Sequence, residues 1–299
     1  MSYWRTYNGQ EKEIQGKAES ESEEKEKAGQ PEEEEPEYRR ILFERLLYRP
    51  TRYQMTYSPV DRGEGQPIVM LHGMFGHASN WHKTIEDLSS RYRTIALEMP
   101  YLSLSKEDSS VKYLARYVLD TIKSMGVEKA IYMGNSLGGH IALEIAVNHR
   151  DNIDGLVLTG SSGLFERSYE KDLQIHPTRP YVKKKVSEMF FDQALISDDL
   201  VDDVYSALTA KDTRLKALRM FKAAKNYNMA SLLSKVKCPT LLVWGREDAI
   251  TPVEVAKEFN AGIKGSRLEI IDNCCHAPMM EYSERFNEIA WEFLKTLQQ

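Results

Sequence analysis

A serine flanked by glycines is the residue of this chain best suited to chemistry. An apolar run at 131–133 ends in Gly134-Asn135-Ser136-Leu137-Gly138, and a helical pattern follows directly. A strand that turns this sharply into a helix has no room for side chains at positions 134 and 138, so both are glycine. The turn pushes the hydroxyl out beside a helix N-terminus, where free N–H groups favour developing negative charge. The segment predicts a nucleophile elbow, and a plain glycine-rich turn is the alternative.

A serine nucleophile requires a histidine and an acid, because its hydroxyl needs a base and the base needs a carboxylate to orient it. Asp248 follows an apolar strand pattern at 238–245, and His276 follows another at 266–271. Open α/β sheets place their sites at the carboxyl ends of such strands. The order along the chain therefore predicts Asp248 as the acid and His276 as the general base.

Rival residues exist for both roles. Glu247 is adjacent to Asp248, and Asp248 itself is a candidate N-cap for the helix that follows it. His140 and His149 lie within and just after the helix that follows the serine, whereas His276 follows the last strand. This placement favours Asp248 and His276.

Two backbone N–H groups are needed to bind the oxyanion of a tetrahedral intermediate. The amide of Leu137, at the helix start, is the first candidate. The second is the amide of Met74, in the loop HGMFG at 72–76 that follows a strand pattern. His72 precedes the turn, and we interpret it as a structural, hydrogen-bonding histidine.

From about residue 40 to its end, the chain resembles the α/β-hydrolase superfamily. Four blocks in one order carry the resemblance: HGMFG at 72–76, GNSLGG at 134–139, GREDAITP at 245–252 and CHAPMMEY at 275–282. The resemblance implies that Ser136 is the nucleophile, Asp248 the orienting acid and His276 the general base. It also implies that the amides of Met74 and Leu137 form the oxyanion hole.

A narrower, partial resemblance is to the meta-cleavage product hydrolases, which cleave carbon–carbon bonds in ring-fission products of aromatic compounds. Gly134-Asn135-Ser136 and the segment DQALIS at 192–197 carry it. Those enzymes usually have a tryptophan directly after the catalytic histidine, where this chain has Ala277. They also have an arginine in the cap, where this chain has Val204. Without these two residues, an uncharged or weakly polar carboxylic ester is favoured over a dienoate substrate.

Strand and helix patterns alternate through the chain, which predicts an α/β fold with a mostly parallel central sheet and helices on both faces. Strands are expected near 67–72, 93–98, 129–134, 154–160, 240–245 and 266–271, and helices near 80–90, 109–125, 137–149, 252–262 and 281–297. Two leading strands, at 41–48 and 51–57, would form an antiparallel edge.

The stretch between the fourth and fifth parallel strands is too long for an ordinary crossover. We assign 163–235 to an inserted helical cap, with helices over 181–191, 198–208 and 212–225, and assign 39–162 and 236–299 to the α/β-hydrolase core. A cap that excludes water would suit acyl chemistry. Candidate pocket residues are Asn135, Phe75, Met189 and Phe190, although a Met/Phe stripe is more often packing.

The charge of the chain is concentrated near its start. Residues 11–36 contain eleven glutamates and four lysines, a net charge of −7, while the whole chain of 299 residues has −5. This tract has too few apolar residues to offset its ordering entropy, so residues 1–38 are predicted to be an acidic, disordered extension. A solubilising role is favoured, and an interaction tail is the alternative.

Composition limits the remaining classes. No apolar stretch approaches the ~20 residues that a membrane span needs. The sequence also lacks the basic stripe that nucleic-acid binding would require. Its three cysteines show no disulfide pattern, which favours a cytoplasmic location. We expect no metal, no cofactor, and a monomer or homodimer. The predicted function is a serine hydrolase that cleaves a small-molecule carboxylic ester through an acyl-enzyme. The alternatives are a carbon–carbon bond hydrolase and a hydrolase-like ligand receptor or scaffold.

Overall fold

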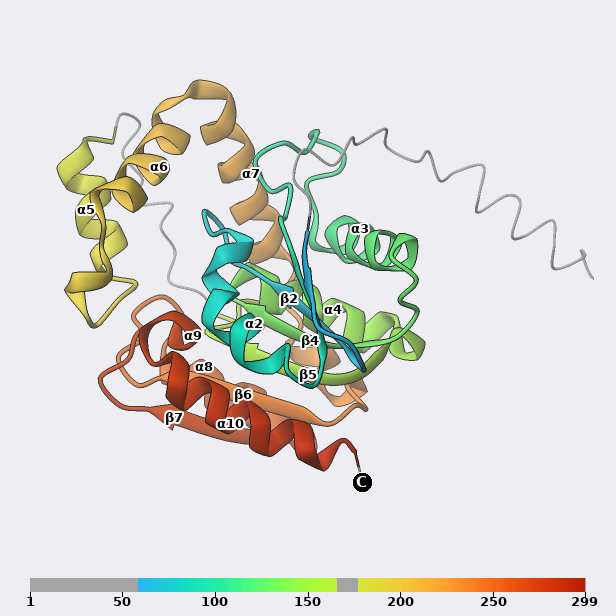
Figure 1. Cartoon of the computed structure of the whole chain (residues 1–299). Coiled ribbons are helices and arrows are strands. Elements are labelled where there is room, and N and C mark those ends of the chain that lie inside the picture. Colours follow the sequence, from blue (N-terminus) through green and yellow to red (C-terminus); the bar gives the residue numbers. More distant parts are fainter. Residues whose placement is uncertain (1–58, 166–176, 299) are drawn as a thin grey trace, which may run out of the picture. The chain divides into compact units, whose positions relative to one another are not determined.

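A seven-stranded sheet forms the centre of the computed structural model, which describes residues 59–165 and 177–298 (Figure 1). Its strand order is β1-β3-β2-β4-β5-β6-β7. β1 runs antiparallel to β3, and every other neighbouring pair is parallel. The strands are β1 (Val60–Arg62), β2 (Pro67–Leu71), β3 (Arg93–Leu97), β4 (Ala130–Asn135), β5 (Ile153–Thr159), β6 (Thr240–Gly245) and β7 (Arg267–Ile271). This confirms the α/β-hydrolase fold class and its mostly parallel sheet.

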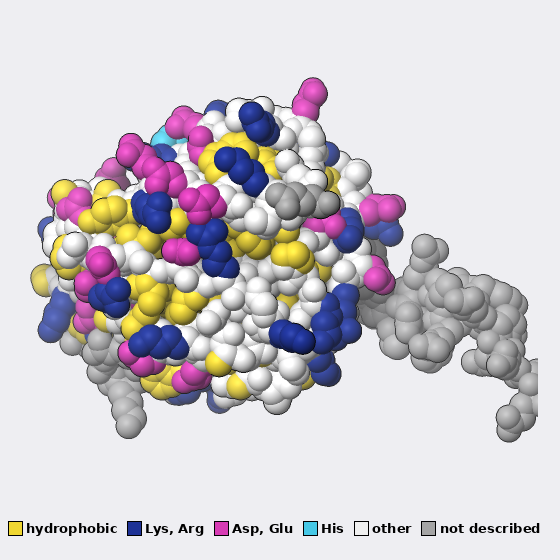
Figure 2. All heavy atoms as spheres, turned by 90° about the horizontal axis from the view of Figure 1, so that it is seen from below, with side chains coloured by type: hydrophobic (Ala, Val, Ile, Leu, Met, Phe, Trp, Pro, Cys, Tyr) yellow, Lys and Arg dark blue, Asp and Glu magenta, His cyan; other side chains and the backbone are white. Residues whose placement is uncertain are grey.

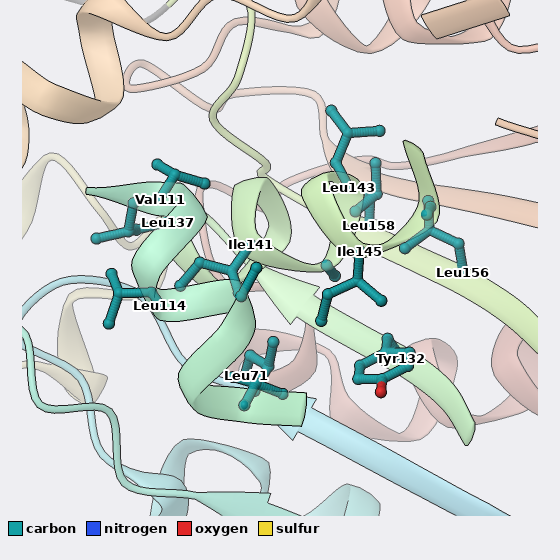
Figure 3. Packing of buried hydrophobic residues seen from close by; sticks show 14 of the residues in the cluster. Leu71, Val111, Leu114, Tyr132, Leu137, Ile141, Leu143, Ile145, Leu156 and Leu158 are labelled. Atoms are coloured by element: carbon teal, nitrogen blue, oxygen red, sulfur yellow. The ribbon is translucent and has the colours of Figure 1, made fainter. Parts of the chain in front are cut away.

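Helices cover both faces of the sheet because successive strand residues point to opposite sides. One layer contains α3 (Val111–Ser124), α4 (Leu137–Asn148) and α8 (Val253–Gly262), and the other contains α2 (His82–Leu88), α9 (Pro278–Glu281) and α10 (Ser283–Thr296). In β2, for example, the side chain of Leu71 packs against the first helix layer and that of Met70 against the second. Figure 3 shows the first layer, where Leu114 and Ile141 from neighbouring helices meet above the strands.

The chain leaves the sheet between β5 and β6, and we call residues 160–239 the insertion. It contains α5 (Arg179–Ser187), α6 (Asp198–Thr209), α7 (Lys211–Asn226) and the 3-10 helices η3 (Gln193–Leu195) and η4 (Ala230–Lys235) (Figure 1, yellow to orange). Two further 3-10 helices, η1 (Ala78–Trp81) and η2 (Arg150–Asn152), lie in loops of the core.

The first helix of the insertion ends earlier than the sequence predicts. Helix α5 stops at Ser187 rather than at residue 191. Beyond it, the carbonyl of Met189 accepts a hydrogen bond from the His276 N–H (3.1 Å), and the Phe191 N–H donates to the Glu281 carboxylate (2.6 Å). Bonds to the core thus replace the bonds that would have continued the helix.

Several predicted features lie outside the described residues, namely the acidic extension 1–38 and the leading strands 41–48 and 51–57. The antiparallel strand that is described, β1, had no sequence prediction. None of the described helices combines the length and apolar character needed to cross a bilayer. On the face shown in Figure 2, acidic and basic side chains are interspersed among separate hydrophobic patches.

Candidate active site

Ser136 occupies the sharp turn between β4 and α4. Its backbone has φ 53° and ψ −119°, a positive-φ conformation that residues other than glycine adopt only under strain. The flanking glycines are required by close approach, because a Cβ at Gly134 would lie 2.5 Å from the Gly138 carbonyl oxygen. A Cβ at Gly138 would lie 2.2 Å from the carbonyl oxygen of Leu71. This is the strained geometry of a nucleophile elbow.

His276 and Asp248 are in contact. The Nδ1 atom of His276 lies 2.9 Å from Oδ2 of Asp248, and the two residues are 2% and 4% exposed. Asp248 also accepts hydrogen bonds from the N–H groups of Ile250 and Thr251 and from the Thr251 hydroxyl. An ionised carboxylate only accepts hydrogen bonds, so we assign the histidine proton to Nδ1, which leaves Nε2 with its lone pair.

The rival acid Glu247 has a different partner. Its N–H donates to the carbonyl of Cys274, and its carboxylate accepts from the Cys274 N–H, both at 3.0 Å. Glu247 thus joins the loop that carries Asp248 to the loop that carries His276. The neighbouring thiol of Cys275 does not line the cavity described below, and burial raises its pKa to about 12, which disfavours the thiolate.

A cavity of about 170 Å³ is lined by both Ser136 and His276. Its wall is mostly apolar and comes from the HGMFG loop, the insertion and α9. All four predicted pocket residues line it: Asn135, Phe75, Met189 and Phe190. Helical periodicity does not tell which face of a helix meets a cavity, and loop residues have no periodicity at all. The sequence therefore did not predict these further wall residues: Val186, Leu208, Phe221, Ile250, Met279 and Met280.

The positions at which the chain departs from the meta-cleavage product hydrolases also lie on this wall. Val204 and Ala277 both line the cavity, so an alanine and a valine replace the expected tryptophan and arginine there. Among the described lining residues the one lysine or arginine is Lys185, and its ammonium lies 3.2 Å from the Glu188 carboxylate. The charge of Lys185 is therefore already balanced beside the cavity.

The loop after β2 passes close to Ser136. A Cβ at Gly73 would lie 2.9 Å from the Cβ of Ser136, and Phe75 turns the chain with φ 60°. Within the described chain, the N–H groups of Met74 and Leu137 have no protein acceptor. His72 shapes the loop: its Nδ1 lies 2.7 Å from the Gly73 carbonyl oxygen, and its Nε2 accepts from the Met99 N–H, as a structural histidine would.

Asn135 fixes the position of the histidine loop. Its side-chain amide donates to the carbonyl of His276 (2.9 Å) and to the carbonyl of Thr159 (3.1 Å). The Asn135 side-chain nitrogen is thereby engaged in two hydrogen bonds within the protein, although the residue also lines the cavity.

Comparison with known proteins identifies the family. The family model described as alpha/beta hydrolase fold matches residues 66–282, and the chain belongs to this family. A relative from Metapseudomonas resinovorans, a 2-hydroxy-6-oxo-6-(2'-aminophenyl)hexa-2,4-dienoic acid hydrolase, is 30% identical over 254 residues, which cover 79% of this chain and 86% of the relative. A second relative, a 2-hydroxy-6-oxononadienedioate/2-hydroxy-6-oxononatrienedioate hydrolase from Paraburkholderia xenovorans, is 29% identical. That match covers 81% of this chain and 90% of the relative.

Solved structures agree with this assignment. An alpha/beta hydrolase enzyme from the metagenome of lagoon sediments at Mar Chica, Morocco, has a TM-score of 0.68 and 33% identity, and the match covers 83% of this chain and 99% of that one. A serine hydrolase involved in carbazole degradation has a TM-score of 0.69 and 28% identity, covering 80% and 94%. A meta-cleavage product hydrolase from Pseudomonas fluorescens IP01 shares the fold, with a TM-score of 0.69 and 24% identity. The partial resemblance to that group is thereby confirmed, while the substrate of this chain is not decided by it.

Proposed function

We propose that this protein is a serine hydrolase that cleaves uncharged carboxylic esters in the cavity beneath the insertion, which serves as its cap. The observation that carries the proposal is the 2.9 Å contact between His276 and Asp248, together with Ser136 and His276 on one apolar wall. A buried carboxylate that orients an imidazole beside a strained serine is the arrangement that activates a hydroxyl nucleophile.

In the acylation step, Nε2 of His276 takes the hydroxyl proton as Oγ of Ser136 attacks the ester carbonyl carbon. The carbonyl oxygen becomes an oxyanion, and the free N–H groups of Met74 and Leu137 are the donors that would bind it. The imidazolium, stabilised by Asp248, then gives its proton to the departing alkoxide oxygen as the carbon–oxygen bond breaks. The alcohol leaves, and an acyl group remains on Ser136.

In the deacylation step, His276 takes a proton from water as the water oxygen attacks the acyl carbon. The second oxyanion uses the same two N–H groups. Collapse of this intermediate breaks the bond to Ser136, and His276 returns the proton to the serine oxygen. The products are a carboxylic acid and the regenerated enzyme, so atoms and protons balance without any cofactor.

The substrate class follows from the cavity wall. Methionine, phenylalanine and aliphatic side chains dominate it, and the charge of Lys185 is balanced by Glu188. Transferring a free carboxylate into such a cavity is costly unless a partner is provided. An acyl group of short to medium length with no charge is therefore favoured.

Hydrolysis of a carbon–carbon bond is the second candidate, and the relatives support it, because they are hydrolases of dienoate compounds. Asn135, before the serine, matches that group, whereas Ala277 and Val204 do not. A third, non-catalytic candidate is a ligand receptor that keeps the pocket without turnover.

Release of p-nitrophenol from acetate, butyrate and octanoate esters by the wild type and Ser136→Ala separates these candidates. Loss of a nucleophile should lower kcat by about 10⁴- to 10⁶-fold, whereas Ser90→Ala at an exposed position should leave it unchanged. Turnover of a vinylogous 1,5-diketone acid without ester turnover would establish the second candidate. Absence of fluorophosphonate labelling at Ser136, with a ligand still bound, would establish the third.

A further inference from the structure

Glu281 at the end of α9 is a half-buried acid that the proposed mechanism does not use. One carboxylate oxygen accepts the N–H of Cys275 at 2.8 Å and the thiol of Cys274 at 3.6 Å. The other accepts the N–H of Phe191, in the insertion, at 2.6 Å. No lysine or arginine pairs with it in the part of the chain that the structure describes, so backbone N–H groups and one thiol hold the charge.

These contacts join two parts of the cavity that are distant in sequence. Cys275 directly precedes His276, and Phe191 directly follows the wall residue Phe190. The N–H of His276 also donates to the carbonyl of the wall residue Met189 at 3.1 Å. The histidine loop and the wall segment 189–191 are thus connected by one direct bond and by one carboxylate bridge.

We propose that Glu281 is a positioning residue, whose carboxylate locks the loop carrying His276 to the cavity wall at Met189. This role rests on the proposed hydrolase function of the cavity. Charge-assisted bonds from backbone N–H groups are stronger and shorter than neutral ones, so a carboxylate can fix two loops that share no regular structure. The imidazole and the acyl-binding wall then keep one relative position, which acyl transfer requires.

The environment of Glu281 makes this lock sensitive to acid. Burial raises the pKa of its carboxyl above the ordinary value, while hydrogen bonds from the backbone of Phe191, Cys275 and Asp192 and from the Cys274 thiol act in the opposite direction. The titratable groups nearest to it are the thiols of Cys274 and Cys275. The carboxylates of Glu247 and Asp248 neighbour these cysteines in turn, and the His276 ring follows Cys275 in the chain. Protonation of Glu281 as the pH falls would convert it to a neutral group and weaken the lock.

The test compares the wild type with Glu281→Gln and Glu281→Asp, and uses Glu284→Gln, an exposed acid at the start of α10, as the matched control. Each full-length protein is assayed on p-nitrophenyl acetate and octanoate between pH 5 and 9, with active sites counted by fluorophosphonate labelling.

For Glu281→Gln we expect kcat per labelled site to fall about 10- to 100-fold on both esters at pH 8. We also expect a higher KM for octanoate and an unchanged KM for acetate. The ratio of wild-type to variant activity should shrink as the pH falls, because the wild type then loses the same charge. Glu284→Gln should match the wild type throughout.

A merely structural role would lower the fraction of labelled sites and leave kcat per site, KM and the shape of the pH profile unchanged, and this result would overturn the inference. If Glu281→Gln does not fold, Glu281→Asp provides the comparison, and its labelling rate constant should fall while its melting temperature stays near that of the wild type. A wild type that labels and turns over esters while both variants equal it would refute the role of Glu281 alone. A wild type that neither labels nor turns over would refute the proposed function and this role together.

Discussion

Acidification from pH 7 to pH 5 should destabilise this protein through His140, a histidine buried in α4. The residue has 0% exposure, and its ring is stacked on that of Tyr227 with centroids 5.7 Å apart. Neither ring nitrogen has a hydrogen-bond partner of good geometry among the described residues. Burial lowers the pKa of His140 from 6.5 to about 4, and the Tyr227 backbone offsets part of that effect. Folding therefore keeps the neutral imidazole and disfavours the charged one.

The sign and size of the effect follow from proton linkage. Between pH 6.5 and about 4 the unfolded chain binds a proton at this histidine and the folded chain does not, so stability falls as the pH falls through that window. Crossing the whole window costs about 3 kcal/mol, at about 1.4 kcal/mol per pKa unit. Between pH 7 and pH 5 the loss is about 2 kcal/mol, a large part of the 5–15 kcal/mol by which domains are stable.

Urea unfolding of the wild type and His140→Phe at pH 7 and pH 5 measures this loss. Phenylalanine keeps a ring against Tyr227 but cannot take up a proton, so its free energy of unfolding should fall by about 2 kcal/mol less than that of the wild type. His82→Gln is the control, because the side chain of His82 is 61% exposed. Other titrating groups are common to the three proteins and cancel in the difference. Equal losses in the wild type and His140→Phe would refute the reasoning.

Two further predictions concern the elbow and the acid. Asp248→Asn should lower kcat about 10⁴-fold, because the amide disfavours the Nδ1 proton of His276. Glu247→Gln keeps its bond to the Cys274 N–H, so its kcat should fall far less. Steady-state ester hydrolysis compares the two variants, and equal losses of kcat would contradict the assignment of Asp248 as the acid. Gly138→Ala should destabilise the fold by about 3 kcal/mol or more, because the new Cβ would lie 2.2 Å from the Leu71 carbonyl oxygen. Gly126→Ala meets nothing within 4 Å and should cost only about 1 kcal/mol, from its φ of 76°; urea titration decides between them.

Local patterns in the sequence were sufficient to predict much of the sheet and the elbow. The apolar runs predicted β4 and β6 to within one or two residues, because buried parallel strands need continuous apolar side chains. The glycines around Ser136 predicted its turn, because their close approach leaves no room for a Cβ. These features depend on neighbours along the chain, and neighbours are what a sequence pattern contains.

Contacts between loops could not be predicted in this way. Glu281 lies in the CHAPMMEY block that marks the family, yet its partner Phe191 is ninety residues earlier. Its role depends on which backbone N–H groups the fold leaves unpaired, and no pattern of side chains encodes that. The early end of α5 has the same origin, because bonds from Met189 and Phe191 to the core replace helical ones. Its position five residues after His276 is the one signal in the sequence that could have drawn attention to Glu281.

The main-chain bonds of His276 connect chemistry with specificity in this fold. Its carbonyl accepts from Asn135, beside Ser136, and its N–H donates to Met189, on the cavity wall. Its ring contacts Asp248, and the residue before it is held by Glu281. The histidine is thus fixed by the core and by the insertion at once. A substitution in the insertion that moves Met189 should therefore change kcat as well as KM, because the wall and the base cannot shift independently.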